Sequence, residues 1–335
     1  MPLPQCLYAT SGAESAARQW CEQLDSMGYR LPLRDGPVSV DARWLRQHPK
    51  LSLICDEQGL WLSGLGMRMQ PDWAGELPRL RRATQKNELL ARACQVEQKP
   101  LIVDGTAGLG HDGLLLAWLG ARVRLIERHP VVVCLLSDAL QQAMKHPELA
   151  GTCQRLSVTW SDSAEAFVAG CVNDSATGTG TATGSATDFV NSFDTSPQAN
   201  SDTELSPQVD PAVIYLDPMF PPPANPRKKA QVKKQMQLLH ALLDSPNAAD
   251  SAPHVNAEMR YTVALNKERE WLLKARTLAA RVIVKRPRHA PYLGELLPDH
   301  QWLGDACRFD AYFNSARQVH AHTPADDEGQ RGDSP

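Results

Sequence analysis

The stretch that decides the fold of this chain is Leu101-Ile102-Val103-Asp104-Gly105-Thr106-Ala107-Gly108-Leu109-Gly110-His111-Asp112-Gly113. It begins with an apolar run, which predicts a buried strand, and continues into a glycine-rich turn that leads to a helix. Glycines let the backbone approach a ligand closely, and the start of a helix offers N–H groups to it. The stretch therefore predicts a ligand-binding turn after a strand of an α/β sheet.

The same stretch fits two kinds of ligand. Gly108, Gly110 and Gly113 match the dinucleotide fingerprint, and Glu127 follows the first of them by about 20 residues, where a ribose-binding carboxylate is expected. Asp104 favours another ligand, because its charge at the strand tip would repel a pyrophosphate and attract a ligand with ammonium and sulfonium groups. An ordinary tight turn, with a surface aspartate and a capping His111, stays an alternative.

From residue 101 onward, short apolar runs alternate with helical patterns, which predicts βαβ units and a mostly parallel sheet. The expected strands are Leu101–Asp104, Arg122–Glu127, Leu156–Trp160, Ala212–Leu216 and Val282–Lys285, with Cys307–Phe313 as an antiparallel edge strand. The expected helices are Gly113–Leu119, Val131–Met144, Ser163–Ala169, Ala230–Leu243 and Glu268–Ala279.

The remaining sequence predicts how the chain is divided. Residues 1–78 read as a small N-terminal α+β unit, 79–100 as a basic linker helix, 101–314 as the main α/β domain and 315–335 as a disordered tail. Residues 172–211 are rich in Thr, Gly, Ser, Asn and Asp and contain no Lys or Arg. We expect them to be a disordered insertion, because they offer too little apolar surface to offset the entropy of ordering.

Composition narrows the protein class. Hydrophobic residues make up 42% of the 335, which suffices for a sizeable core, and no apolar run reaches the roughly 18 residues of a membrane span. The 8 cysteines form no C-x-x-C pair, so we expect neither a metal site nor a disulfide framework, and a cytoplasmic protein. The net charge of −3 is unusual for a nucleic-acid enzyme, but many of the acids fall in segments expected to be disordered.

A second segment, Val213–Pro221, ends an expected strand in Asp217-Pro218-Met219-Phe220. Ligands of open α/β sheets bind at the carboxyl ends of strands, so this turn should share a crevice with Gly108 and Glu127. The Asp217 carboxylate and the Pro218 carbonyl are suited to accept N–H groups from an exocyclic amine of a base, and Phe220 to stack on its face. A strand-terminating Asp-Pro turn is the alternative.

Further candidates follow the strands. Glu127 is suited to accept both ribose hydroxyls, and Asp162 and Ser163 to meet the adenine or its ribose, although these two equally fit a helix N-cap. Basic residues around the expected crevice predict contacts to RNA phosphates, with a solvated helix face as the alternative for the lysines. The predicted RNA contacts are Arg81, Arg82, Lys228, Lys229, Lys233, Lys285 and Arg286.

These residues resemble the ribosomal RNA small subunit methyltransferase J family. The resemblance is carried by Val103–Asp112, Arg122–Val132, Tyr215–Pro221, Val284–Pro287 and Arg308–Tyr312. It implies a class I fold dependent on S-adenosyl-L-methionine, and methyl transfer to the N2 amine of a guanine in small-subunit (16S) ribosomal RNA, free or in the 30S subunit. The cofactor contacts implied or expected are Asp104, Gly105, Gly108, Gly110, His111, Asp112, Glu127, Arg128, Asp162, Ser163 and Asp217.

One departure and several alternatives remain. Many family members carry a glycine-rich basic stretch where this chain has Arg81–Glu88. The Asp-Pro-Met-Phe turn would also serve a methyltransferase acting on adenine N6 or on a protein amide, because each holds a planar amine. An NAD-dependent oxidoreductase using the glycine-rich turn, and a catalytically silent RNA-binding protein, are the alternatives from other classes.

Overall fold

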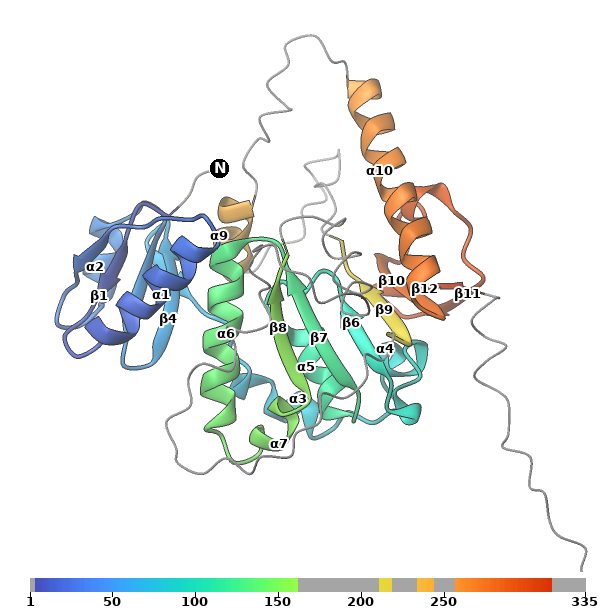
Figure 1. Cartoon of the computed structure of the whole chain (residues 1–335), viewed down its shortest axis with the longest axis horizontal. Coiled ribbons are helices and arrows are strands. Elements are labelled where there is room, and N and C mark those ends of the chain that lie inside the picture. Colours follow the sequence, from blue (N-terminus) through green and yellow to red (C-terminus); the bar gives the residue numbers. More distant parts are fainter. Residues whose placement is uncertain (1–3, 162–210, 219–233, 244–256, 315–335) are drawn as a thin grey trace, which may run out of the picture.

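The computed structural model describes residues 4–161, 211–218, 234–243 and 257–314. Its centre is a seven-stranded sheet in the order β11-β12-β10-β9-β6-β7-β8 (Figure 1). Neighbours from β8 to β10 pair in parallel, and β12 is antiparallel to both β10 and β11. The strands are β6 (Leu101–Asp104), β7 (Arg122–Glu127), β8 (Leu156–Trp160), β9 (Val213–Leu216), β10 (Arg281–Pro287), β11 (His300–Leu303) and β12 (Cys307–Phe313).

This sheet confirms the predicted mostly parallel α/β architecture, with one correction. The Cys307–Phe313 strand is antiparallel as expected, but it is not the edge of the sheet, because β11 pairs with its outer side. The sequence of β11, His-Gln-Trp-Leu, is only four residues long and half polar, so it carries little of the alternating pattern that predicts a strand.

Helices cover both faces of this sheet (Figure 1). On one face, α5 (His111–Trp118) and α6 (Pro130–Met144) pack in the core cluster that includes Ile283 of β10. On the other face, α10 (Ala257–Leu278) packs against Val282 and Val284, since neighbouring residues of a strand point to opposite faces. Within the described ranges, no helix is long and apolar enough to cross a membrane.

The predicted helices differ from the observed ones mainly at their ends. α6 begins at Pro130, where proline lacks only an N–H that has no helical partner, and His129 caps it by accepting from the Val131 N–H. α9 (Lys234–Leu243) and α10 are seen, and α10 starts earlier than expected. A short α7 (Ala150–Cys153) was not expected. The expected helix 163–169, insertion 172–211 and tail 315–335 lie outside the described residues.

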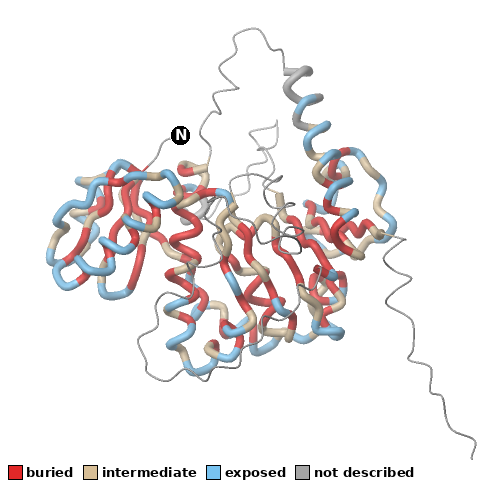
Figure 2. Tube along the Cα trace, in the orientation of Figure 1, coloured by how far each residue is buried: buried red, intermediate tan, exposed pale blue. Residues whose placement is uncertain are grey.

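The first part of the chain forms a second, smaller sheet of five strands in the order β2-β1-β3-β4-β5. Its elements are β1 (Leu7–Ala9), α1 (Glu14–Ser26), β2 (Leu33–Asp35), α2 (Ala42–Gln47), β3 (Ser52–Asp56), β4 (Gly59–Gly64) and β5 (Met67–Met69). One hydrophobic cluster runs from this sheet through α6 into the main sheet, and Figure 2 shows buried residues along both sheets and between them. The N-terminal unit therefore has its own sheet but shares its core.

The expected linker helix at 79–100 is wrong. Residues 74–98 form η1 (Ala74–Glu76), α3 (Leu77–Leu80), α4 (Leu89–Ala93) and η2 (Val96–Gln98) instead of one helix. Between α3 and α4, the Asn87 side chain accepts from the Thr84 N–H at 2.7 Å and the Thr84 hydroxyl accepts from the Asn87 N–H at 3.1 Å. Such side-chain bonds to backbone groups compete with the helical pattern and break it.

Candidate active site

The candidate site lies where the strand order of the main sheet reverses. From β6 the chain proceeds outward through β7 and β8, and then returns to the other side of β6 as β9. Such a reversal opens a crevice at the carboxyl ends of the two central strands. Asp104 ends β6, Glu127 ends β7 and Asp217 directly follows β9, so the sequence-predicted acids come together there.

Hydrogen bonds join the three strand ends. Asp104 Oδ1 accepts from the Thr106 N–H at 3.0 Å, and the Thr106 hydroxyl oxygen accepts from the Asp217 N–H at 2.6 Å. Glu127 Oε2 accepts from the Gly108 N–H at 3.1 Å. Thr106 thus links the turn after β6 to the end of β9, and Glu127 holds the same turn from β7.

The glycine-rich turn has the backbone that its composition predicts. Gly108 and Gly110 have φ of +53° and +76°, a region that residues with a Cβ rarely adopt. Besides Gly108, Glu127 holds the backbone N–H groups of Arg128 at 2.8 Å and His129 at 2.9 Å through Oε1. Burial raises the pKa of Glu127 above its usual value, against the effect of these three N–H donors.

Asp104 forms the floor of the crevice and is only 2% exposed. Burial, together with the nearby charges of Asp112, Asp217 and Glu127, raises its pKa to about 8. The sequence predicted a fixed negative charge at Asp104, but this charge depends on pH, because at neutral pH the carboxyl group is largely protonated. A cation in the crevice would favour the charged form, so the group still discriminates for a positively charged ligand.

Nearer the surface, Lys285 on β10 joins two of the acids. Its Nζ lies 2.7 Å from Asp112 Oδ2 and 2.9 Å from Asp217 Oδ2, and the Tyr215 hydroxyl donates to Asp112 Oδ2 at 2.7 Å. The side chains of Asp112, Lys285 and Asp217 are 20%, 28% and 36% exposed. Asp217 is therefore the acid of this network that is most open to solvent.

Lys285 controls the charge of both partners. Burial tends to raise the pKa of Asp112, but the Lys285 charge and the hydrogen bonds from Lys285 and Tyr215 outweigh it, so this pKa lies below its usual value. The pKa of Asp217 is raised by burial, and Lys285 opposes that rise. The pKa of Lys285 itself is raised, since the two carboxylates outweigh its burial. Within the described residues, Asp217 Oδ1 has no hydrogen-bond partner.

The structure places the expected RNA contacts differently. Lys285 belongs to the crevice network instead of its rim. Arg286 is 4% exposed and donates to the Pro291 carbonyl at 2.6 Å and 2.9 Å, which argues against a phosphate contact. Arg81 forms an exposed ion pair with Glu148, and Arg82 is exposed. The expected site residues Asp162, Ser163, Phe220, Lys228, Lys229 and Lys233 lie outside the described residues.

Sequence reasoning did not predict the roles of Tyr215, Thr106 and Lys285 in the crevice, and it assigned Lys285 to RNA contacts instead. Tyr215 lies two residues before Asp217, so strand alternation puts both on one face, a signal that the sequence does contain. Lys285 follows the register pair Val284↔Leu216, which brings it level with Asp217. That pairing is visible only once β9 and β10 are known to be neighbours. Nothing in the sequence, apart from the position of Thr106 in the turn, predicted that its hydroxyl accepts from the Asp217 N–H.

The N-terminal unit supports the turn from outside the main sheet. The Trp73 indole N–H donates to the Leu109 carbonyl at 3.0 Å, and Glu76 Oε1 lies 3.4 Å from Nδ1 of His111. A Cβ at Gly110 would lie 2.8 Å from both Trp73 and Leu136 side-chain atoms, so a larger residue there would force one of these side chains to shift. The approach of the residues just before α3 therefore fixes the shape of the glycine-rich turn.

Taken together, these residues fit a cationic nucleoside ligand. The glycine turn admits it closely, and Glu127 stands beside the turn. Four carboxyl groups face the crevice, and among the described residues Lys285, Arg79 and Arg128 are the cations that act on them. An acid-lined crevice of this kind favours a sulfonium and an ammonium over a pyrophosphate.

Comparisons with known proteins agree with this geometry. A family model described as a putative SAM-dependent methyltransferase matches residues 44–173 and 192–263. The chain is 42% identical over 317 residues to the ribosomal RNA small subunit methyltransferase J of Acinetobacter baylyi, covering 93% of this chain and 98% of that protein. The protein of the same name from Alkalilimnicola ehrlichii is 36% identical over 302 residues, covering 89% of this chain and 90% of that one.

A solved structure resembles the whole fold. The crystal structure of the SAM-dependent methyltransferase NGO1261 from Neisseria gonorrhoeae is 25% identical with a TM-score of 0.58, covering 92% of this chain and 96% of that chain.

Proposed function

The chain belongs to the ribosomal RNA small subunit methyltransferase J family and uses S-adenosyl-L-methionine on a class I fold, and from this premise we propose that it methylates the N2 amine of a guanine in small-subunit ribosomal RNA. The observation that carries the proposal is the placement of Asp217. Its carboxylate is the acid of the crevice network that is most open to solvent, and it lies 2.9 Å from Lys285, with one oxygen without a partner among the described residues. Family membership sets the oxidoreductase alternative aside.

Residues of the glycine-rich turn and of the ends of β6 and β7 would hold the cofactor. Bound there, S-adenosyl-L-methionine supplies an electrophilic methyl group on sulfur, with a neutral thioether as leaving group. Glu127 is suited to the ribose hydroxyls, and the acids around Asp104 to the positive groups. We keep His111, Asp112 and Arg128 as further proposed contacts, together with Asp162 and Ser163 beyond the described residues.

Asp217 would orient the target amine. An exocyclic amine on a base is a poor nucleophile because its lone pair is delocalised into the ring. A carboxylate that accepts one N–H, and the Pro218 carbonyl accepting the other, would turn that lone pair toward the methyl group and hold it there. When the new N–C bond forms, the nitrogen becomes positively charged, and the Asp217 carboxylate is placed to take the released proton.

Lys285 would keep Asp217 ready for this role. Burial alone favours the protonated acid, which would donate a hydrogen bond instead of accepting one, and the Lys285 ammonium opposes this effect. Lys285 also ties Asp217 to Asp112, next to the glycine-rich turn, so the substrate and cofactor sides of the crevice are held in one network. Phe220, the residue proposed to stack on the base, lies outside the described residues.

The test is to methylate protein-free small-subunit RNA and assembled 30S particles from a strain that lacks this protein. With radiolabelled S-adenosyl-L-methionine, the label should appear in N2-methylguanosine after digestion to nucleosides. Label in N6-methyladenosine, or in ribosomal protein, would overturn the guanine assignment. Asp217→Ala should bind S-adenosylhomocysteine but transfer no methyl group, whereas a silent RNA-binding protein would show no transfer even before mutation.

A further inference from the structure

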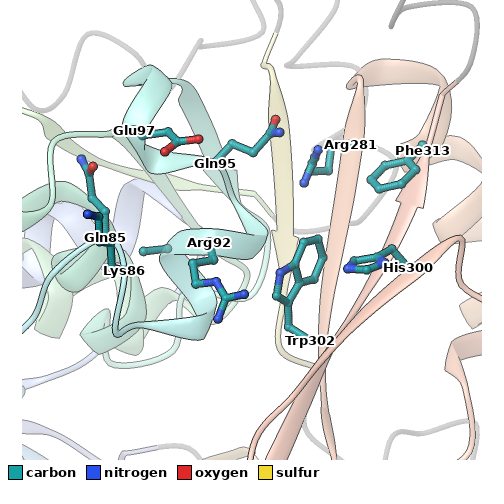
Figure 3. A pocket seen from close by; sticks show the side chains of 10 residues that line it. Gln85, Lys86, Arg92, Gln95, Glu97, Arg281, His300, Trp302 and Phe313 are labelled. Carbon is teal, nitrogen blue, oxygen red and sulfur yellow. The ribbon is translucent and has the colours of Figure 1, made fainter.

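A second cavity lies on the main sheet away from the catalytic crevice. Its volume is about 710 Å³, within the range of ligand pockets, and it separates the segment from α4 to η2 from strands β10 to β12 (Figure 3). No residue of the crevice network lines it. We call this cavity the edge pocket. Its lining residues are Gln85, Lys86, Ala91, Arg92, Gln95, Glu97, Arg281, His300, Trp302 and Phe313.

The edge pocket gathers cations that form no ion pair with any carboxylate in the described part of the chain. Among the described residues, no acid lies within ion-pair distance of Lys86, Arg92 or Arg281, although Glu97 also lines the cavity. Single arginines without an ion pair also occur elsewhere on the described surface, such as Arg18 and Arg43, so what distinguishes the pocket is that three such cations line one cavity. Three cations and one carboxylate around one concave site leave an excess of positive charge, which suits an anion such as a phosphate.

Planar groups form one wall of the pocket. The Arg281 guanidinium carbon lies 4.8 Å from the centre of the Phe313 ring and 5.9 Å from that of Trp302. The His300 and Trp302 rings meet edge to face at 4.4 Å. Arg281 is held in this position because it donates to the Ala93 carbonyl at 2.9 Å. Aromatic rings and a fixed guanidinium plane are the surfaces on which unpaired bases of RNA stack.

The pocket is close enough to the crevice to share one substrate. Arg281 and Lys285 lie four residues apart on β10, on the same face, a distance of roughly 13 Å along the strand. Trp302 pairs with Phe309, and Phe309 with Lys285, so Trp302 lies two strands away, roughly 10 Å. A few nucleotides of single-stranded RNA cover such a distance.

We propose that the edge pocket binds a nucleotide of single-stranded RNA that flanks the target, with its base on the wall of Trp302, Arg281 and Phe313 and its phosphates at Lys86 and Arg92. This inference rests on the proposed function, since it adds a second contact to the same RNA substrate. The site lies outside the residues that would hold the cofactor or the reacting amine. It therefore contributes to the affinity and position of the RNA, and leaves the methyl transfer step itself unchanged.

The experiment measures RNA binding and methylation separately. The double variant Lys86→Glu with Arg92→Glu changes two exposed side chains, and Arg18→Glu with Arg43→Glu makes the same charge change on exposed residues of the N-terminal unit as the control. Anisotropy of a labelled single-stranded RNA from the substrate region is followed across a salt series, with S-adenosylhomocysteine present. The pocket variant should bind more weakly by at least about tenfold, and its salt slope should fall by about 1.4 relative to the control, as expected for two lost phosphate contacts.

A Trp302→Ala variant tests the stacking wall. It should weaken RNA binding by about 5- to 100-fold, while Trp302→Phe should restore most of the affinity and both should bind S-adenosylhomocysteine as the wild type does. Methylation by these variants should return to the wild-type rate at saturating RNA. Thermal unfolding of each variant shows whether it folds, and Lys86→Glu with Arg92→Glu gives an independent answer if Trp302→Ala does not.

The outcomes separate the two proposals. If the wild type methylates RNA but the pocket variants match the control in affinity and salt slope, the edge pocket is overturned and the proposed function stands. If the wild type methylates no RNA but binds it through the pocket, the proposed function is wrong and the edge-pocket proposal stands. If a free mononucleotide binds the pocket and quenches Trp302 while RNA does not compete, the pocket serves a small ligand and the proposal of an RNA contact is wrong.

Discussion

The catalytic crevice and the edge pocket have opposite chemistry on the same sheet. The crevice gathers carboxyl groups around one lysine, whereas the edge pocket gathers two arginines and a lysine around one glutamate. A cationic cofactor is attracted by acids, but the phosphates of RNA are repelled by them. An acid-lined crevice therefore suits the cofactor and an uncharged base but not the RNA phosphates, so we expect the cations that contact those phosphates to lie outside it.

The largest effect is expected from Asp217 in the crevice. Asp217→Asn keeps the shape but removes the charge that would accept the amine N–H, so we expect the methylation rate to fall by about 100- to 1,000-fold. Single-turnover kinetics and calorimetry with S-adenosylhomocysteine measure rate and cofactor binding separately. The affinity for S-adenosylhomocysteine should stay within about threefold of the wild-type value. The substitution keeps the backbone N–H of residue 217, which donates to the Thr106 hydroxyl oxygen and holds the turn. A variant that loses cofactor and rate together would show that Asp217 acts on the cofactor instead.

The next largest effect is expected from Lys285. Its substitution also tests whether this residue acts in the crevice or in RNA binding. Lys285→Met removes the charge that opposes protonation of Asp217, so we expect a rate loss of about 30- to 100-fold and an acidic limb of the pH–rate profile shifted to higher pH. The direction follows because the rate needs ionised Asp217, whose pKa rises when Lys285 is lost. Lys285→Arg should recover part of the rate. If Lys285→Met changed only RNA affinity and its salt slope, the lysine would belong with the RNA contacts.

How much of this could be read from the sequence differs between the two regions. Asp104, Glu127 and Asp217 end buried apolar runs, and the strand ends of a parallel sheet meet at one edge, so their convergence followed from pattern alone. The partners of these acids did not follow, because Lys285 reaches Asp217 only through the pairing of β9 with β10. The sequence predicted RNA contacts for Lys285 and its neighbour Arg286, whereas Lys285 joins the crevice acids and Arg286 is buried against the Pro291 carbonyl.

The edge pocket was beyond sequence reasoning. Its walls come from residues 85–97 and 281–313, two segments far apart in the chain, and the first was expected to be one continuous helix. The break at Thr84 and Asn87 depends on side-chain bonds that compete with helix formation, and β11 is too short and polar to show a strand pattern. The strands β1, β2 and β5 are three residues each and escape periodicity for the same reason.

A smaller effect is expected at Gly110, in the turn that borders the crevice but not the edge pocket. Gly110→Ala adds a Cβ at positive φ and close to Trp73 and Leu136, whereas Gly28→Ala, at a φ of +75°, meets nothing within 4 Å. We expect Gly110→Ala to lower the free energy of unfolding by about 1–2 kcal/mol more than Gly28→Ala does, measured in urea. It should also weaken cofactor binding and leave RNA binding at the edge pocket intact. Equal losses in the two variants would mean that the turn relaxes freely.

The smallest expected effect concerns Asp104. Its pKa of about 8 in the folded chain lies above the ordinary value of 3.8, so the folded state holds a proton that the unfolded state has lost. Stability from this group is therefore fully present only below about pH 3.8, falls as the pH rises from there through 8, and falls by about 1 kcal/mol between pH 7 and 9. Asp104→Asn should remove that part of the slope in urea unfolding curves recorded across this range.

Cofactor binding offers a second readout of the same group. A sulfonium favours ionised Asp104, so the preference for S-adenosylmethionine over the uncharged-sulfur product should increase from pH 7 toward pH 9 in the wild type and stay flat in Asp104→Asn. A wild-type preference that does not change with pH would place the sulfonium away from Asp104.

The continuous core between the two sheets has a consequence for how the molecule unfolds. The Leu60 N–H donates to buried Asp138 of α6 at 3.0 Å, and one hydrophobic cluster crosses that junction. Cutting the chain after the small sheet would expose an apolar side of α6 and leave that carboxylate without its donor, so neither fragment should be soluble by itself. Heating the intact chain should accordingly give a single cooperative transition. The N-terminal sheet stabilises the main domain, so its removal should also unfold the part of the chain that holds the crevice.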